Sequence, residues 1–186
     1  MSHFTDTYEI AQQITQDGID FFFVSLGNRD IIKIVQYLYV GSFQGKELYN
    51  LGFGDYNYRA HLYSDDIATN NGDPYNVYHT VLATIPCFFQ IFEEAMIVVQ
   101  GSDSSQNFQE DCRITCTRKC LTNACKKAHR RINIYRNYID KHFENLTQEY
   151  EFFGSLKPYE SQILAEEYIK GKKYLTILLK NRKFII

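Results

Sequence analysis

The sequence predicts an α+β domain, a two-layer sandwich in which two main helices cover a mostly antiparallel sheet. Short runs rich in aromatic and β-branched residues come first, and longer stretches with helical spacing follow them. Strands grouped before helices favour this class over alternating strand and helix units. The aromatic content, 15 Tyr and 14 Phe without Trp, favours a β-rich core packed by rings.

The length and composition predict one domain over residues 1–186. Hydrophobic residues make up 45% and charged residues 23%, close to globular averages, and 3 Pro and 10 Gly leave little sequence for linkers. Residues 1–18 are expected to form an N-terminal arm or a short helix, because residues 7–16 carry a weak apolar stripe at helical spacing.

Strands are expected before the first helix, over residues 20–25, 31–39, 48–53 and 65–69. The first contains the run FFFVS, and Asn28-Arg29-Asp30 supplies turn-forming residues before the second. The first two strands should therefore form a hairpin.

A helix is predicted to begin at Pro74, with Asp73 as its N-cap. Apolar residues then recur at helical spacing as far as Phe92. Pro86 removes one backbone hydrogen bond inside this helix and should kink it. A buried strand over residues 96–99 is expected next.

The rest of the chain predicts a long helical region from Gln106 to about Tyr150 and a closing pair of strands near residues 174–179. Residues 106–129 form a cysteine-rich, basic helical insertion within it. Three antiparallel strands followed by helix, strand, helix and strand is also an order found in the ribonuclease H-like fold, which we take as an analogy of topology alone.

Three sequence pieces resemble an uncharacterised bacterial family of small domains of unknown function. In shorter members of that family, the Gly-Ser turn leads almost directly into an Arg-containing helix, whereas here a segment with four cysteines intervenes. The resemblance implies one fold and a cytoplasmic location, and it implies no reaction. The pieces are Leu51–Tyr56, then Thr69–Asp73 with Val81–Thr84, and Val98–Ser102 with Arg130, Arg131 and Tyr135.

The turn after the strand at residues 96–99 is a candidate anion site. Gly101, Ser102 and Ser104 lie between a buried strand and a helix start, where free backbone N–H groups and the helix dipole favour an anion. Asp103 could instead cap the helix and compete with the anion. The spacing of a phosphate-binding loop is missing.

Three arginines further along the chain could complete this anion site. Arg130, Arg131 and Arg136 have guanidinium groups suited to phosphate or carboxylate. The alternative is an ordinary helix cap beside a solvated basic helix face.

A ladder of cysteines forms a second candidate site. Cys112, Cys116 and Cys120 lie at spacings of four, on one face of a helix, and Cys125 follows them. One straight helix cannot place all four around a zinc ion, whose bonds to sulfur are about 2.3 Å long, so a bend would be required. The alternatives are a redox role or simple helix packing.

Basic residues are concentrated between Arg113 and Arg136, with almost no acidic residues among them. In a chain of formal net charge −2 this local excess could follow a nucleic-acid backbone, bind a nucleotide or bind an acidic protein. A solvated helix face is the alternative.

Carboxylates at turns suggest an enzymatic alternative. If Asp55 or Asp73 lay near Gly101, a two-metal phosphoryl-transfer site could form there. Turn and cap roles explain the same residues without a reaction.

We therefore predict a small cytoplasmic binding or regulatory module that engages an anionic partner, either nucleic acid or nucleotide, through the Gly-Ser turn and the basic helix. The alternatives are a metal-dependent phosphoryl-transfer or nuclease-type enzyme and a protein–protein interaction domain. We expect no secretory signal, because the first residues have neither a basic start nor an apolar run, and the apolar runs of the sequence are too short to span a membrane. We expect no membrane contact and mostly reduced cysteines.

Overall fold

The computed structural model describes residues 7–64, 71–115, 120, 125–159 and 163–182. This part of the chain contains nine strands and three α-helices, and it divides into two compact units, residues 1–95 and residues 96–186. We call these the N-terminal and C-terminal units. The strand pairings within each unit are antiparallel, which confirms the predicted α+β class. The single domain and the ribonuclease H-like strand order stay predictions.

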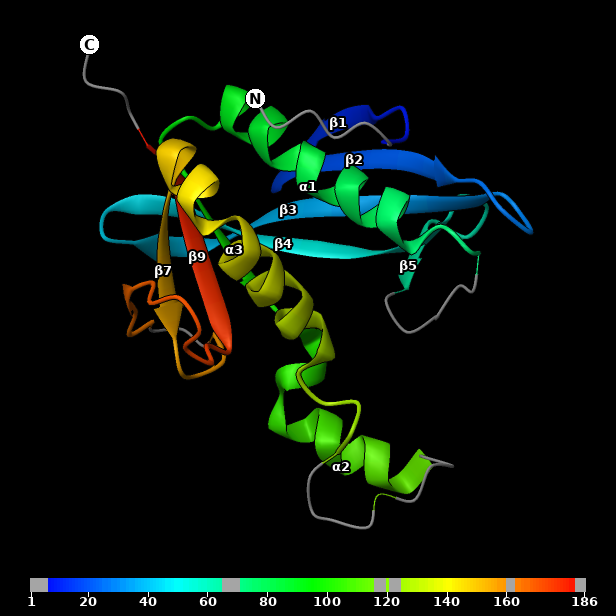
Figure 1. The fold of residues 1–186 in the computed structure, drawn as a ribbon. Coiled ribbons are helices and arrows are strands. Elements are labelled where there is room, and N and C mark those ends of the chain that lie inside the picture. The colour runs from blue at the N-terminus through cyan, green and yellow to red at the C-terminus, as the bar shows by residue number, and fades with distance from the viewer. Residues whose placement is uncertain (1–6, 65–70, 116–119, 121–124, 160–162, 183–186) are drawn as a thin grey trace. The chain divides into compact units, whose positions relative to one another are not determined.

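The N-terminal unit is built on a meander of antiparallel strands (Figure 1). Strands that follow one another in the chain are neighbours in the sheet. The hairpin predicted from residues 20–25 and 31–39 is therefore confirmed. The strand predicted at residues 65–69 lies outside the described residues. The strands are β1 (Ala11–Thr15), β2 (Gly18–Ser25), β3 (Ile31–Phe43), β4 (Lys46–Asn57) and β5 (Leu62–Ser64).

The N-terminal segment forms a strand where we expected an arm or a short helix. Strand β1 pairs with β2 from Ala11↔Phe22 to Thr15↔Gly18, and most of its side chains are exposed. The weak apolar stripe therefore has no core to pack against, and backbone pairing determines the structure. Gly18 lets the start of β2 lie close to β3, since a Cβ there would lie 1.8 Å from the Tyr37 carbonyl oxygen.

Helix α1 (Pro74–Ile91) packs against β2 and β3, and it begins at the predicted residue. Tyr37 lies at the centre of this interface. Its ring stacks on Phe88 at a centroid distance of 4.5 Å, and its hydroxyl lies 2.7 Å from the Thr84 hydroxyl. The ring therefore buries apolar area while its polar end keeps a partner.

The C-terminal unit has a second group of paired strands, β6 (Met96–Gln100), β7 (Tyr150–Ser155), β8 (Glu166–Glu167) and β9 (Thr176–Asn181). They are ordered β6-β9-β7-β8, so the closing strand lies between β6 and β7. Gly154 in β7 leaves room for the Tyr174 ring, whose atoms would lie 2.5 Å from a Cβ at that position.

The helical region predicted from Gln106 to Tyr150 contains two helices in the described residues. Helix α2 spans Gln106–Thr115, residues 126–129 form a turn, and α3 (Arg130–Glu149) begins after His129, which has a left-handed φ of 61°. Helix α3 contacts β6, β7 and β9. None of the helices in the described residues is long and apolar enough to cross a membrane.

Candidate functional site

The Gly-Ser turn follows β6 and forms a short 3-10 helix, η1 (Ser102–Ser104). Gly101, Asp103 and Ser104 are buried, while Ser102 is exposed. The turn therefore offers little of its backbone to an external ligand.

Asp103 reaches across to the start of α3. One of its carboxylate oxygens accepts the backbone N–H of Arg131 at 3.1 Å, and its carbonyl accepts the N–H of His129 at 3.1 Å. His129, at the N-cap position, provides no side-chain cap of its own. A carboxylate at this end of a helix is stabilised by the free N–H groups and by the helix dipole. Asp103 thus occupies the place that an external anion would need at α3.

Gly101 is required for this close approach. A Cβ on Gly101 would lie 2.4 Å from a carboxylate oxygen of Asp103 and 3.2 Å from the backbone nitrogen of Ile132. That same carboxylate oxygen, Oδ1, and the hydroxyl of Ser104 are buried and have no hydrogen-bond partner among the described residues. The turn is packed closely against the first turn of α3.

We expect Gly101→Ala to destabilise the protein by about 1–3 kcal/mol, because the added methyl overpacks the contact with Asp103. Gly52→Ala is the matched control, since a Cβ at Gly52 meets only the Tyr63 hydroxyl at 3.8 Å. Urea unfolding followed by circular dichroism measures both. Equal unfolding midpoints for the two variants would show that the turn is not tightly packed.

The three predicted arginines have different positions. Arg131 donates to the Ser102 hydroxyl at 2.6 Å and so joins the turn. Arg136 instead donates to the Tyr174 carbonyl at 3.1 Å and to Asn133 at 2.6 Å. Arg130 is exposed. The structure therefore brings only Arg131 to the Gly-Ser turn.

Two of the predicted cysteines meet. Cys112 in α2 is buried, and its sulfur lies 3.3 Å from that of Cys125 in the turn before α3. Hydrogen bonds, first from the Lys127 backbone N–H and then from the Cys112 side chain, lower the pKa of the Cys125 thiol. Cys120 is half-buried, and Cys116 lies outside the described residues. Within the described ranges, no group of three His, Cys, Asp or Glu side chains could hold a metal ion, so the zinc site stays a prediction.

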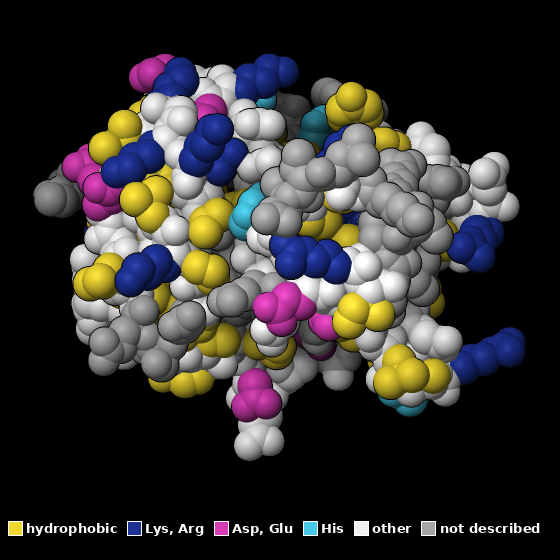
Figure 2. All heavy atoms as spheres, turned by 90° about the horizontal axis from the view of Figure 1, so that it is seen from below, with side chains coloured by type: hydrophobic (Ala, Val, Ile, Leu, Met, Phe, Trp, Pro, Cys, Tyr) yellow, Lys and Arg dark blue, Asp and Glu magenta, His cyan; other side chains and the backbone are white. Residues whose placement is uncertain are grey.

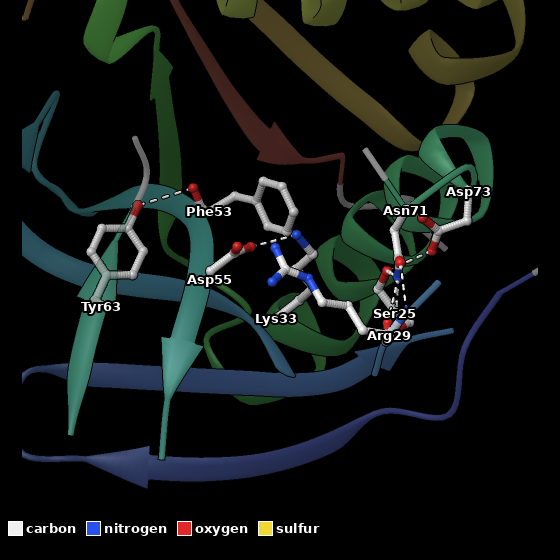
Figure 3. A network of polar contacts seen from close by, with 8 residues as sticks. All are labelled: Ser25, Arg29, Lys33, Phe53, Asp55, Tyr63, Asn71 and Asp73. Carbon is white, nitrogen blue, oxygen red and sulfur yellow. Dashed lines mark hydrogen bonds and ion pairs between the residues drawn. The ribbon is translucent and has the colours of Figure 1, made fainter. Parts of the chain in front are cut away.

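A second polar constellation lies at one end of the N-terminal sheet (Figure 3). Side chains alternate between the faces of a sheet, and the register places Phe23, Lys33 and Asp55 opposite one another on β2, β3 and β4. Ser25 follows Phe23 on the same face. The inward face thus changes from aromatic to polar at its last positions.

Lys33 and Asp55 form an ion pair in which 5% of the lysine side chain and 15% of the aspartate side chain are exposed. The Lys33 ammonium lies 6.0 Å from the centre of the Phe53 ring. In Figure 3 the Arg29 side chain extends from the preceding turn in the direction of this pair. The enclosed Lys33 ammonium therefore interacts with groups of the protein and is poorly placed to contact an external ligand.

The turn before α1 completes this constellation. The Asn71 amide donates to the Ser25 hydroxyl at 2.9 Å and to the Arg29 carbonyl at 2.9 Å. Asp73 accepts from Ser25 at 2.7 Å and from Tyr8 at 2.6 Å (Figure 3 shows the Ser25 contact). Asp73 occupies the N-cap position of α1, but its side chain makes no capping bond.

Burial by itself would raise the pKa of Asp73, but the hydrogen bonds from Tyr8 and Ser25, with the Lys33 charge, lower it overall. A carboxylate with a lowered pKa stabilises the fold above its unfolded pKa, and this stabilisation is lost as the pH falls through the folded pKa. Asp55 and Asp73 thus both have partners within the N-terminal unit. These contacts involve one oxygen of each carboxylate, Oδ1 of Asp55 and Oδ2 of Asp73.

Charge is unevenly divided between the two units. The C-terminal unit carries sixteen of the 20 Lys and Arg residues and ten of the 22 Asp and Glu residues, which gives it a formal charge of +6 and the N-terminal unit −8. On the face shown in Figure 2, Lys and Arg side chains are spread out, with hydrophobic and acidic side chains between many of them. A binding contact would therefore depend on a local cluster.

We call Cys112 and Cys125 the thiol pair. Three exposed cations, Lys126, Lys127 and Arg130, follow Cys125 within five residues. They lie in the turn before α3 and at its first residue. Among residues that the structure describes, no acidic side chain forms an ion pair with any of the three. We call these three residues the basic turn.

Comparison with known proteins identifies a family. No curated protein and no solved structure matches the chain. A family of unknown function, DUF6934, matches residues 5–117, which include the N-terminal unit's polar constellation, the Gly-Ser turn and α2, while the basic turn follows the matched part. The match confirms the resemblance to an uncharacterised family, and the chain belongs to the family of unknown function DUF6934.

Proposed function

We propose that this protein is a binding module whose C-terminal unit contacts an anionic polymer, a nucleic-acid backbone, through the basic turn. The observation that carries this proposal is that Lys126, Lys127 and Arg130 are all exposed and lie within five residues of one another in the sequence. The charge of +6 on the unit supports it, because a positive surface attracts a polyanion from a distance and then holds its phosphates at short range.

The mode of contact differs from the one expected for the Gly-Ser turn. Asp103 already fills the start of α3, and Gly101 and Ser104 are buried, so backbone N–H groups are not available there. Long, exposed lysine and arginine side chains can instead reach phosphates without a preformed pocket. Such contacts favour an extended backbone over a single nucleotide, which a protein usually encloses.

Binding is measured by fluorescence anisotropy with labelled single-stranded and double-stranded 20-nucleotide probes over a series of salt concentrations. For Lys126→Ala, Lys127→Ala and Arg130→Ala combined, we expect affinity for duplex DNA to fall roughly tenfold or more near 0.1 M salt. The dependence of log K on log salt should become shallower by about 0.9 for each lost phosphate contact.

The matched control removes the same charge elsewhere in the C-terminal unit, by Lys141→Ala, Lys170→Ala and Lys173→Ala. These three lysines are also exposed. The control should bind almost as the unaltered protein does. If both triple variants lose affinity equally, bulk charge and not the basic turn binds the polymer. If the unaltered protein binds no probe even at low salt, the proposed function is wrong.

A further inference from the structure

The thiol pair in the C-terminal unit has a geometry that its packing alone does not require. Cys112 comes from α2 and Cys125 from the turn before α3, yet their sulfur atoms are 3.3 Å apart. A disulfide bond is about 2.05 Å long, so the sulfurs would need to approach by only a little more than 1 Å. Both cysteines are thiols in this structure.

The two sulfurs differ in accessibility. Cys112 is buried, with 8% of the residue exposed, whereas Cys125 is half-buried. The backbone N–H groups of Lys127 and Ala128 also favour the thiolate of Cys125, and they lower its pKa. An accessible thiolate beside a buried thiol is the arrangement of an attacking and a resolving cysteine.

We propose that Cys112 and Cys125 are a thiol–disulfide exchange site, which closes to an intramolecular disulfide by reaction with a low-molecular-weight disulfide. The Cys125 thiolate attacks one sulfur of that disulfide, forms a mixed disulfide and expels a small thiolate, which takes up the proton that Cys125 released. Cys112 then loses its proton and attacks the Cys125 sulfur, and the second small thiolate leaves and is protonated. The protein loses two electrons and two protons, and the small disulfide becomes two thiols.

The two other described cysteines provide comparisons. Cys87 in α1 is the one cysteine in the sequence of the N-terminal unit, and its sulfur lies 3.5 Å from the Ala83 carbonyl oxygen. Cys120 also interacts with the Cys125 thiol and is the competing partner. Experiment must therefore decide whether Cys125 pairs with Cys112 or with Cys120.

The test exposes the full-length reduced protein to excess glutathione disulfide, blocks the remaining thiols and maps tryptic peptides by mass spectrometry. The expected product lacks two hydrogens and contains a peptide ending at Arg113 joined to a peptide beginning at Cys120. Fragmentation should locate the bond at Cys112 and Cys125. The variant Cys120→Ser should form the same bond.

The variant Cys112→Ser should instead accumulate a glutathione adduct at Cys125, because the resolving thiol is missing. Cys125→Ser should form neither that adduct nor the intramolecular bond. A bond between Cys120 and Cys125 in the unaltered protein, with no bond formed in Cys120→Ser, would overturn the proposal. So would a protein that keeps all its thiols, or one that keeps a stable glutathione adduct at Cys125. The exchange is expected whether or not the basic turn binds nucleic acid.

Discussion

Replacing Lys33 by Met is expected to lower the free energy of unfolding by about 3–5 kcal/mol. The substitution keeps most of the side-chain volume but removes the ammonium, which leaves Asp55 as an enclosed carboxylate without its cation. Asp73 also loses a favourable charge. Breaking one partner of a buried ion pair is costly because the remaining charge must be desolvated without compensation. Urea unfolding measures the change, and tyrosine fluorescence can follow it in a chain without Trp.

The chain offers a matched control in the same unit. Lys46 pairs with Glu94, but 32% and 58% of their side chains are exposed. Lys46→Met should therefore cost less than about 1 kcal/mol. Changing both partners of the enclosed pair, by Lys33→Met with Asp55→Leu, should recover most of the stability lost in Lys33→Met, because no unpaired charge remains. If Lys33→Met costs no more than Lys46→Met, solvent reaches Lys33 more freely than its burial indicates.

The strands of the N-terminal unit were predictable from local pattern. Aromatic and β-branched runs, separated by turn residues, place β2, β3 and the middle of β4 close to their observed bounds. Strand β1 was not predictable in this way, since its side chains are mostly exposed and carry no alternating pattern. Pairing with β2 determines it, and such pairing is a tertiary effect.

The helices show a similar division. Pro74 after Asp73 marks the start of α1 from sequence alone. No Pro or Gly occurs in the sequence between α2 and α3, so the apolar and basic pattern appeared continuous across residues 106–150. The left-handed conformation of His129 then separates α2 from α3, and this conformation is uncommon outside glycine.

The polar constellation of the N-terminal unit was hidden by distance in sequence. Ser25, Lys33 and Asp55 come from three strands, and each looks ordinary in its own segment. Once the hairpin turn at residues 26–30 is assigned, alternation places Ser25 and Lys33 on the inward face, which is the signal that could have identified them. The bonds of Asn71 to that turn depend on the tertiary fold and have no local signature.

The second large effect is expected at Asp103. Replacing it by Ala should lower the free energy of unfolding by roughly 2 kcal/mol, because the Arg131 N–H and the start of α3 lose their acceptor in a buried place. Asp103→Asn keeps an acceptor oxygen and should recover about half of that loss, since Asn also caps well but lacks the charge that the helix dipole favours. Ser102→Ala, at an exposed residue of the same turn, should cost less than about 0.5 kcal/mol.

The same variants also distinguish two places where an anion could bind. If phosphate bound at the start of α3, removing the resident carboxylate with Asp103→Asn would strengthen binding to oligonucleotides, because a like charge would disappear from the site. If the basic turn binds the polymer, Asp103→Asn should leave the salt dependence of binding unchanged, while removal of Lys126, Lys127 and Arg130 makes it shallower. Anisotropy titrations of Asp103→Asn, at a temperature where it is fully folded, decide between the two places. Tighter binding by this variant would show that the polymer contacts the Gly-Ser turn and not the basic turn. In the unaltered protein, the carboxylate of Asp103 occupies the helix start at that turn.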